Sequence, residues 1–233
     1  MKIISWNCQQ GFINKDKYKR LIELAPDIAI IPECQNTDQF MRELNIYDGI
    51  WCGKNENKGL GIISLSDKYK LSIIKEFPSF EWIVPIKVTG EEDFTLIAVW
   101  PIRQEGISYG KYVLTALSEY GELLRNQHVI IMGDFNIDQK LKASYRGIKG
   151  MGEINEFLGM FGIRSCYHHF TNESFGEEAT PTYYHHRKKD QPFHIDYCFV
   201  SQSILDKNTR FCIKDNDVWQ GLSDHLPLIL EMN

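Results

Sequence analysis

The sequence contains no apolar stretch that approaches the roughly 20 residues needed for a membrane-spanning helix. Residues 1–7 lack the long apolar core and the small-residue cleavage site of a signal peptide, and are instead typical of a strand. No Cys-x-x-Cys motif and no regular spacing occur among the 6 cysteines. These absences argue against a membrane protein and a disulfide scaffold, so we expect a cytoplasmic protein with reduced thiols and no membrane partner.

Positive charge is also scarce. Lys and Arg number 26 against 31 Asp and Glu, and the net charge of −5 argues against a general basic coat for nucleic acid while leaving room for a local basic patch. There is no internal repeat, low-complexity tract or linker, and the 43% hydrophobic and 12% aromatic content indicates a substantial core. We expect one domain over residues 1–233, and a monomer.

The strongest local pattern is the stretch 129–136, Val-Ile-Ile-Met-Gly-Asp-Phe-Asn. Its apolar start predicts a strand buried on both faces, which Gly133 is expected to end. Residues two apart in an extended chain point the same way, so Asp134 and Asn136 can face one pocket while Phe135 turns into the core. The alternative is a turn that merely terminates a buried strand.

Polar residues also stand at the end, within or just before several other expected strands. These residues are Asn7, Glu33, Asp196, Asp224 and His225. Collected at one edge of a sheet sandwich, carboxylates bind a hard cation and an imidazole handles protons. The pattern therefore predicts a cation site with acid-base chemistry.

The remaining elements follow from hydrophobic periodicity. Helices are predicted near 14–25, with Asn14 as N-cap, and near 37–44, 110–125 and 151–161. Closely spaced strands, expected to be antiparallel, are predicted at 50–52, 60–65, 69–77, 82–88 and 94–100. The segment 164–192 has little periodicity and many aromatic, histidine and basic residues, which is typical of surface loops that touch ligand.

Five motifs occur in an order that resembles the endonuclease/exonuclease/phosphatase family, which includes deoxyribonuclease I and exonuclease III. They are Ser5-Trp6-Asn7, Pro32-Glu33, Gly133-Asp134-Phe135-Asn136, Ile195-Asp196-Tyr197 and Ser223-Asp224-His225, and they span nearly the whole chain. The resemblance implies an α/β (α+β) fold, a four-layered sandwich of two packed mixed β-sheets flanked by helices. It also implies divalent-metal-dependent cleavage of phosphoester bonds.

The resemblance assigns a metal site. Glu33 is similar to the family's main magnesium ligand, and Asn7 and Asp224 are implied to lie close to the ion. Oxygen ligands suit Mg²⁺ or Mn²⁺, whereas Zn²⁺ would prefer more histidine or cysteine. We therefore expect Mg²⁺ as the cofactor, with Mn²⁺ as an alternative.

The resemblance also assigns catalytic roles. His225 is similar to the family's catalytic histidine, and Asp196 to the carboxylate that orients it. Asp134 and Asn136 match the pair that positions the attacking water and the phosphate. An imidazole with a reference pKa of about 6.5 can take a proton from water near neutral pH, and a paired carboxylate fixes its tautomer.

One position departs from the family pattern. Trp100 follows a strand after which many relatives carry a histidine or tyrosine, and an indole cannot exchange a proton near neutrality. Protonation of the leaving oxygen then falls to the metal and its water, which we favour, or to Tyr109 or Tyr112. Trp100 as a core aromatic is the alternative, and His194 stands where relatives often have arginine.

The basic run that starts at Arg187, beside Tyr183, is a candidate to grip phosphates and stack bases, with a solvated loop tip as the alternative. Each histidine pair, 168–169 and 185–186, offers at most one ligand to a metal, because neighbours on a strand face opposite sides. Candidate substrate contacts are thus Trp100, Tyr109, Tyr112, His169, Tyr183, Arg187 and His194.

The sequence favours a nuclease that hydrolyses nucleic-acid phosphodiester bonds, with DNA favoured over RNA and with endonuclease and exonuclease both open. The first alternative is a phosphatase or phosphodiesterase on a small substrate such as a phosphoinositide or nucleotide. The second is a binding module without catalysis, against which the intact polar set argues.

Overall fold

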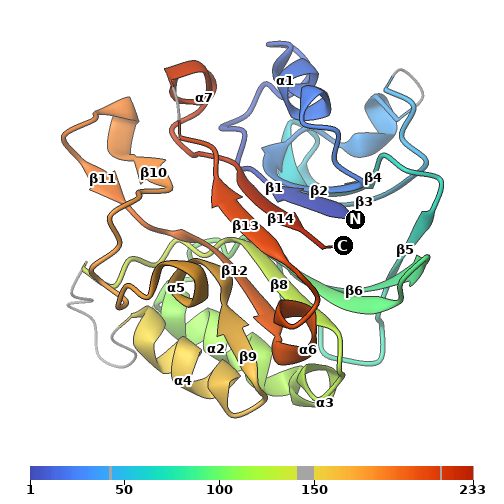
Figure 1. The fold of residues 1–233 in the computed structure, drawn as a ribbon. Helices are drawn as coiled ribbons and strands as arrows, with labels where there is room; N and C mark the ends of the chain where they lie inside the picture. Colours follow the sequence, from blue (N-terminus) through green and yellow to red (C-terminus); the bar gives the residue numbers. More distant parts are fainter. Residues whose placement is uncertain (42–43, 141–149, 216, 233) are drawn as a thin grey trace.

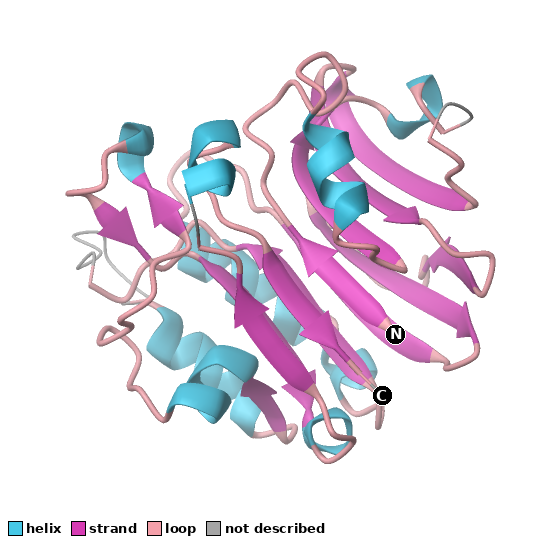
Figure 2. Cartoon of the chain, turned by 45° about the horizontal axis from the view of Figure 1, so that its top comes forward, coloured by secondary structure: helices cyan, strands magenta, loops and turns pink. Residues whose placement is uncertain are grey.

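Two six-stranded mixed sheets pack face to face with helices on their outer faces, giving four layers (Figures 1 and 2). The computed structural model describes residues 1–41, 44–140, 150–215 and 217–232. The arrangement is the predicted four-layered α/β sandwich. In the described ranges, no helix is long and apolar enough to cross a membrane.

The first sheet carries both ends of the described chain. Its strand order is β13 (Arg210–Ile213), β14 (Leu228–Glu231), β1 (Lys2–Ser5), β2 (Ile28–Cys34), β4 (Lys58–Ser64) and β3 (Asp48–Asn55). Only β1 and β2 pair in parallel, and β1 lies between β2 and the late strand β14. The outer face is covered by α1 (Lys17–Glu23), η1 (Thr37–Gln39) and α7 (Asp217–Leu222).

The second sheet holds the central strand. Its order is β5 (Tyr69–Ile73), β6 (Ile83–Gly90), β7 (Phe94–Val99), β8 (Val129–Asp134), β12 (Asp196–Ser201) and β9 (Ile163–Ser165), with β7 and β8 parallel. Its outer face is covered by α2 (Tyr109–Glu119), α3 (Gly121–Leu124) and α4 (Met151–Gly159). The remaining elements are α5 (Cys166–Thr171), β10 (Tyr183–Tyr184), η2 (His185–Arg187), β11 (Pro192–Phe193) and α6 (Gln202–Leu205).

Strand β8 is apolar on both faces, as predicted, because each face meets a different core. Ile130 and Met132 join the core between the sheets, whereas Val129 and Ile131 pack with the outer helices. All four side chains have 0% exposure. The strand is therefore fixed from both sides, which holds the residues at its end in place.

Gly133 does not end this strand, contrary to the prediction. It pairs with Val99 on one side and with Tyr197 on the other, and β8 continues to Asp134. A Cβ at position 133 would lie 1.9 Å from the carbonyl oxygen of Val99. Glycine is needed here for the close approach of two backbones, so that the strand can carry Asp134 to the sheet edge.

The helix boundaries differ from the predicted ones. Helix α1 begins at Lys17, and its N-cap is Asp16, in the left-handed region and without a side-chain cap bond, rather than Asn14. The predicted helix 110–125 is divided into α2 and α3 at Tyr120, whose hydroxyl donates to the carbonyl oxygen of Ile83. Of the predicted helix 37–44, η1 is present, and residues 42–43 lie outside the described residues.

The closely spaced strands are antiparallel as predicted but belong to both sheets: β3 and β4 to the first, β5 to β7 to the second. Strand β5 ends at Ile73 rather than continuing to 77. The backbone N–H of Ile74 still donates to the carbonyl oxygen of Pro85 at 2.9 Å, but Pro85 has no N–H to return a bond, so the ladder stops. The 6 cysteines are free thiols, in line with the expectation.

We expect Gly133→Ala to lower the free energy of unfolding by about 2 to 3 kcal/mol, because the added methyl group would push β7 and β8 apart. Urea denaturation followed by circular dichroism measures the change. Gly121→Ala is the control: its Cβ meets open space, so the free energy of unfolding should change by less than about 1 kcal/mol. Equal stability of the two variants would contradict the close-approach argument.

Candidate active site

Polar residues from both sheets meet at one end of the sandwich. We call this set the polar edge: Asn7 after β1, Glu33 in β2, Asp134 at the end of β8, Asp196 at the start of β12, and Asp224 and His225 before β14. Asn7 joins the sheets: its Nδ2 donates to Asp134 Oδ2 at 3.0 Å and lies 3.5 Å from Glu33 Oε1. Residues 127 positions apart in sequence are thus hydrogen-bonded in one site, which also includes Asp224 and His225 from the far end of the chain.

A buried histidine-carboxylate pair forms the inner part of the polar edge. His225 Nδ1 lies 2.9 Å from Asp196 Oδ2 and 3.2 Å from Oδ1, while Nε2 lies 3.8 Å from Asp134 Oδ2. The backbone N–H of His225 donates to Ser223 Oγ, which itself donates to the carbonyl oxygen of Asn7 at 2.7 Å. The imidazole is held at one nitrogen and presents the other toward Asp134.

Electrostatics favour a proton on this pair. Burial alone would lower the pKa of His225, but the negative charges of Asp196 and Asp134 raise it to about 10. Burial, followed by the charge of Asp196, raises the pKa of Asp134 to about 7. Neutral imidazole, the form that can accept a proton, would be favoured by a cation placed among these carboxylates, because the cation repels the imidazolium.

Asp134 and Asn136 are linked as an Asx turn. The backbone N–H of Asn136 donates to Asp134 Oδ1 at 2.8 Å, and Asn136 adopts a left-handed conformation with φ 55°. Its Nδ2 lies 3.3 Å from Asp134 Oδ2 and from the carbonyl oxygen of Pro101. Phe135 turns into the core with 0% exposure, as predicted. The turn therefore brings the predicted pair together.

Glu33 lies at a β-bulge. The register of β2 shifts between Pro32 and Cys34, and Glu33 has φ 63°, a conformation rare for a residue with a side chain. Its Oε2 pairs with Lys58 Nζ at 3.2 Å. The bulge turns the carboxylate of Glu33 out of the sheet and toward Asn7.

Asp224 lies on the outer side of the polar edge. Burial raises the pKa of its carboxyl group above the ordinary value. Its Oδ2 accepts a hydrogen bond from Gln9 Nε2 at 2.8 Å, and Gln9 Oε1 accepts from Arg187 Nε at 3.0 Å. The guanidinium of Arg187 also donates to the carbonyl oxygens of Gly221 and Leu222. Arg187 thus holds Gln9, which in turn holds Asp224.

The donors of the polar edge fit a hard divalent metal ion. Asp134, Asp196 and His225 each place one ligand atom within 4.8 Å of the others, and Glu33 and Asp224 add further carboxylate oxygens. Carboxylate and amide oxygens are the ligands of such ions, and burial raises the pKa values of Asp134 and Asp224, a shift that a bound cation would oppose. Because His225 Nδ1 is bonded to Asp196, we favour oxygen donors as ligands.

The aromatic candidates have different surroundings. Trp100 is 3% exposed and its ring packs against Trp82 at 5.2 Å, which fits the alternative of a core aromatic. The hydroxyl of Tyr112 donates to the carbonyl oxygen of Glu81. Burial and then the charge of Asp134 raise the pKa of Tyr109. Of the two tyrosines, Tyr109 is therefore the one whose pKa is affected by a charge of the polar edge.

The hydrogen bonds and ring contacts of the two histidine candidates go to residues outside the polar edge, and the two differ in exposure. His194 is 3% exposed, donates from Nδ1 to the carbonyl oxygen of Thr180 at 2.8 Å, and packs against Tyr167. Its Nε2 is buried and finds no hydrogen-bond partner in the described residues. His169 is exposed on α5, with its ring against Phe170. The fold thus holds His194 as a packed ring and leaves His169 at the surface.

Tyr183 is brought next to the inner pair. Its ring centroid lies 4.6 Å from that of His225, and the two residues form an antiparallel bridge. The surrounding segment, expected to be loops, contains α5 and the β10–β11 hairpin beside α7 (Figure 1). The hairpin therefore forms one wall next to the polar edge.

Sequence reasoning missed three contributors. Gln9 and Lys58 contact Asp224 and Glu33, and Thr182 Oγ1 accepts the backbone N–H groups of Ile195 and Asp196 at 3.0 Å. Gln9 stands two positions after Asn7, a spacing that could have suggested it. Lys58 and Thr182 carry no local signal.

A four-layered sandwich whose strand ends gather carboxylates around a histidine-aspartate pair defines a phosphoester hydrolase. The sequence profile of the Endonuclease/Exonuclease/phosphatase family matches residues 4–225. The chain belongs to this family. A search of curated protein sequences gives no match.

Solved structures share this fold. A 3'-5' exonuclease (NExo) from Neisseria meningitidis has 17% identity and a TM-score of 0.71, covering 100% of both chains. An AP endonuclease from Archaeoglobus fulgidus has 16% identity and a TM-score of 0.68, covering 100% of this chain and 99% of that one. TDP2 from D. rerio, complexed with a single-strand DNA product, has 16% identity and a TM-score of 0.68, covering 100% and 98%.

We expect Asp196→Asn to lower the pKa of His225 in metal-free protein, because it removes the negative charge that stabilises the imidazolium. Since the folded pKa of about 10 lies above the ordinary 6.5, this pairing stabilises the fold fully below pH 6.5. That stability is lost as the pH rises toward 10, and the variant should lose less over this range.

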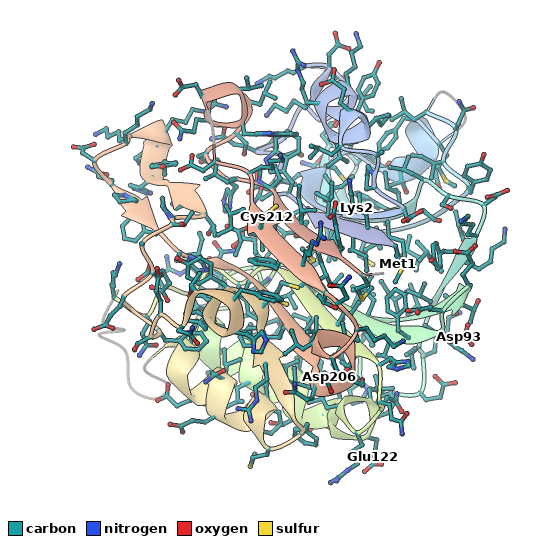
Figure 3. The ribbon with its side chains drawn as sticks, viewed as in Figure 1. Met1, Lys2, Asp93, Glu122, Asp206 and Cys212 are labelled. Carbon is teal, nitrogen blue, oxygen red and sulfur yellow. The ribbon has the colours of Figure 1, made fainter. Side chains whose placement is uncertain are left out.

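An NMR titration of the imidazole resonances, with EDTA present, measures this pKa. Asp206→Asn is the control, because Asp206 lies at the α6 end of the molecule (Figure 3), far from the β10–β11 hairpin. An unchanged pKa in Asp196→Asn would refute the assigned pairing.

Proposed function

We propose that the protein is a magnesium-dependent nuclease that hydrolyses phosphodiester bonds, with DNA as the favoured substrate. The observation that carries the proposal is the contact of His225 with Asp196 on one side and Asp134 on the other, beside the oxygen donors of Asn7 and Glu33. The similar structures include nucleic-acid enzymes, one of them complexed with single-strand DNA product and one bound to a product DNA hairpin.

For the metal, we propose that Glu33 is the principal ligand and that Asn7 and Asp224 complete the protein side of the site. Their oxygen atoms suit Mg²⁺, with Mn²⁺ as a substitute of similar preference. When bound, the cation offsets the negative charge that grows on the phosphate in the transition state.

For the nucleophile, we propose that His225 Nε2 accepts the proton of the attacking water. Asp196 keeps the proton on Nδ1 and stabilises the imidazolium that forms. Asp134 Oδ2 lies 3.8 Å from Nε2, so a water at the side of the two atoms can donate one hydrogen bond to each of them and be oriented by Asp134. Asn136 Nδ2 lies 3.3 Å from Asp134 Oδ2 and from the carbonyl oxygen of Pro101, so it has to release one of these long bonds to donate to a phosphate oxygen.

For the substrate side, we propose that Tyr183 and the β10–β11 hairpin contact the nucleotide next to the scissile bond. The ring of Tyr183 lies beside His225 and is half-buried, which leaves part of it available for stacking. The guanidinium of Arg187 donates its hydrogen bonds to Gln9 and to the carbonyl oxygens of Gly221 and Leu222. We therefore propose that Arg187 fixes the position of the hairpin instead of binding the substrate.

A small phosphoester is the second candidate substrate, and one observation favours it. Two of the cations on this side of the described chain are already paired: Lys189 with Asp217 at 2.9 Å, and Lys58 with Glu33 at 3.2 Å. With a net charge of −5, a long polyanion would gain little general attraction. A nucleotide or phosphoinositide would need fewer cations than a polynucleotide.

We expect purified protein to cleave DNA with Mg²⁺ and to stop when EDTA is added. His225→Ala and Glu33→Ala should each lower kcat/KM by about 100-fold or more, since they remove the base and the proposed ligand. The exposed His169→Ala should retain wild-type activity. Duplex, abasic and single-stranded DNA, RNA and small phosphoesters should be tested in parallel.

Turnover of a small phosphoester without cleavage of any polynucleotide would replace the nuclease by the second candidate. Turnover of none of these substrates by correctly folded protein would leave only a binding module.

We expect Tyr109→Phe to leave kcat within about twofold of wild type, because we favour the metal and its water as the proton donor to the leaving oxygen. A loss of about 100-fold would instead assign that step to the Tyr109 hydroxyl, whose pKa is raised by burial and by the charge of Asp134. Tyr112→Phe, whose hydroxyl is already bonded to Glu81, should leave kcat unchanged and serves as the control. Steady-state rates on a duplex of defined sequence measure both. An unchanged kcat in Tyr109→Phe assigns the protonation to water.

A further inference from the structure

Lys58 brings a partly exposed cation next to the polar edge. It is the first residue of β4, and its Nζ lies 3.2 Å from Glu33 Oε2 and 5.8 Å from the centre of the Trp100 ring. The side chain of Lys58 is 40% exposed, against 19% for Glu33. The ammonium group therefore lies between the proposed metal ligand and the solvent.

The backbones of both partners are fixed, although the ion pair between them is not. Gly59 packs so closely on Trp51 that a Cβ there would lie 2.4 Å from the indole, and Asn55 pairs with Lys58 across the β3–β4 turn. Glu33 is fixed by the bulge in β2. A half-exposed ion pair contributes little stability, so Lys58 can leave Glu33 at small cost.

A divalent cation and Lys58 compete for the same carboxylate. Glu33 Oε1 faces Asn7 and Oε2 faces Lys58, so a metal ion held by Glu33 would lie next to the ammonium group. Like charges at such a distance repel one another. A metal ion on Glu33 would therefore weaken the ion pair with Lys58, and an ammonium group released from Glu33 would need a new acceptor.

We propose that Lys58 exchanges partners during the reaction cycle. It holds Glu33 in the metal-free protein, releases it when the divalent cation binds, and then donates to a non-bridging oxygen of the substrate phosphate. The substrate half of this inference rests on the proposed function. The substrate phosphate fits as this acceptor, because it is an anion and would bind beside the metal ion, next to the released ammonium group.

Other cations near the site do not share this position. Lys54, in the same turn, pairs with Glu81 at 2.7 Å, and its side chain is 76% exposed. Arg187 contacts Gln9 and two carbonyl oxygens instead of a carboxylate. Among these three cations, Lys58 is thus the one that forms an ion pair with a proposed metal ligand.

The test is Lys58→Met, measured in two ways. In a calorimetric titration of the protein with Mn²⁺ and no substrate, we expect the Kd to fall about two- to fivefold, because a competing charge is lost. In steady-state cleavage, we expect KM to rise about tenfold, because a charged donor to the phosphate is lost. The two effects have opposite signs, which a merely structural role would not produce.

Lys54→Met is the matched control, since it removes the same charge from the same turn, and both quantities should stay at the wild-type value. Lys58→Arg should restore KM. A Kd for Mn²⁺ that rises or stays constant in Lys58→Met would overturn the exchange, as would equal effects in Lys54→Met. If wild-type protein binds Mn²⁺ but turns over no phosphoester, the proposed function fails, whereas the titration still decides whether Lys58 competes with the metal.

Discussion

The hydrogen bond from Asn7 to Asp134 is the contact on which the rest of the site depends. Asn7 follows a strand of one sheet and Asp134 ends a strand of the other, so this bond closes the sandwich at one end. Both residues are almost fully buried, at 2% and 1% exposure. A buried carboxylate needs partners, and Asn7, the backbone of Asn136 and nearby His225 supply them. The hydrogen-bond partners that the buried carboxylate of Asp134 needs therefore determine much of the geometry of the polar edge.

Two separate cores keep this end of the molecule rigid. The core between the sheets and the core under α2 to α4 grip β8 from opposite faces, and a third core lies under α1 and α7. Interiors packed at this density transmit small displacements instead of absorbing them. Tight packing therefore fixes the positions of side chains at the strand ends. Acid-base chemistry between His225 and Asp134 requires such fixed positions.

The fold class and most of the polar edge could be predicted because their signals are local. An apolar run followed by a polar residue places Asp134 or Glu33 at a strand end whatever the partners are. Lys58 and Thr182 could not be predicted, because their roles arise only from pairing with distant segments. Likewise, the aromatic packing of His194 and Trp100 is set by tertiary neighbours. Gly133 was misjudged because a glycine in a strand and a glycine that ends one look alike in sequence.

The place of β1 in its sheet governs when activity can arise. This strand is made first, yet it lies between β2 and β14, and β14 is the last strand of the described chain to be synthesised. His225 and Asp224 directly precede that last strand. Until β14 and the segment before it have joined β1, the first sheet is therefore incomplete and Asp196 has no imidazole partner. The two ends of the described chain must therefore meet before the histidine-carboxylate pair exists.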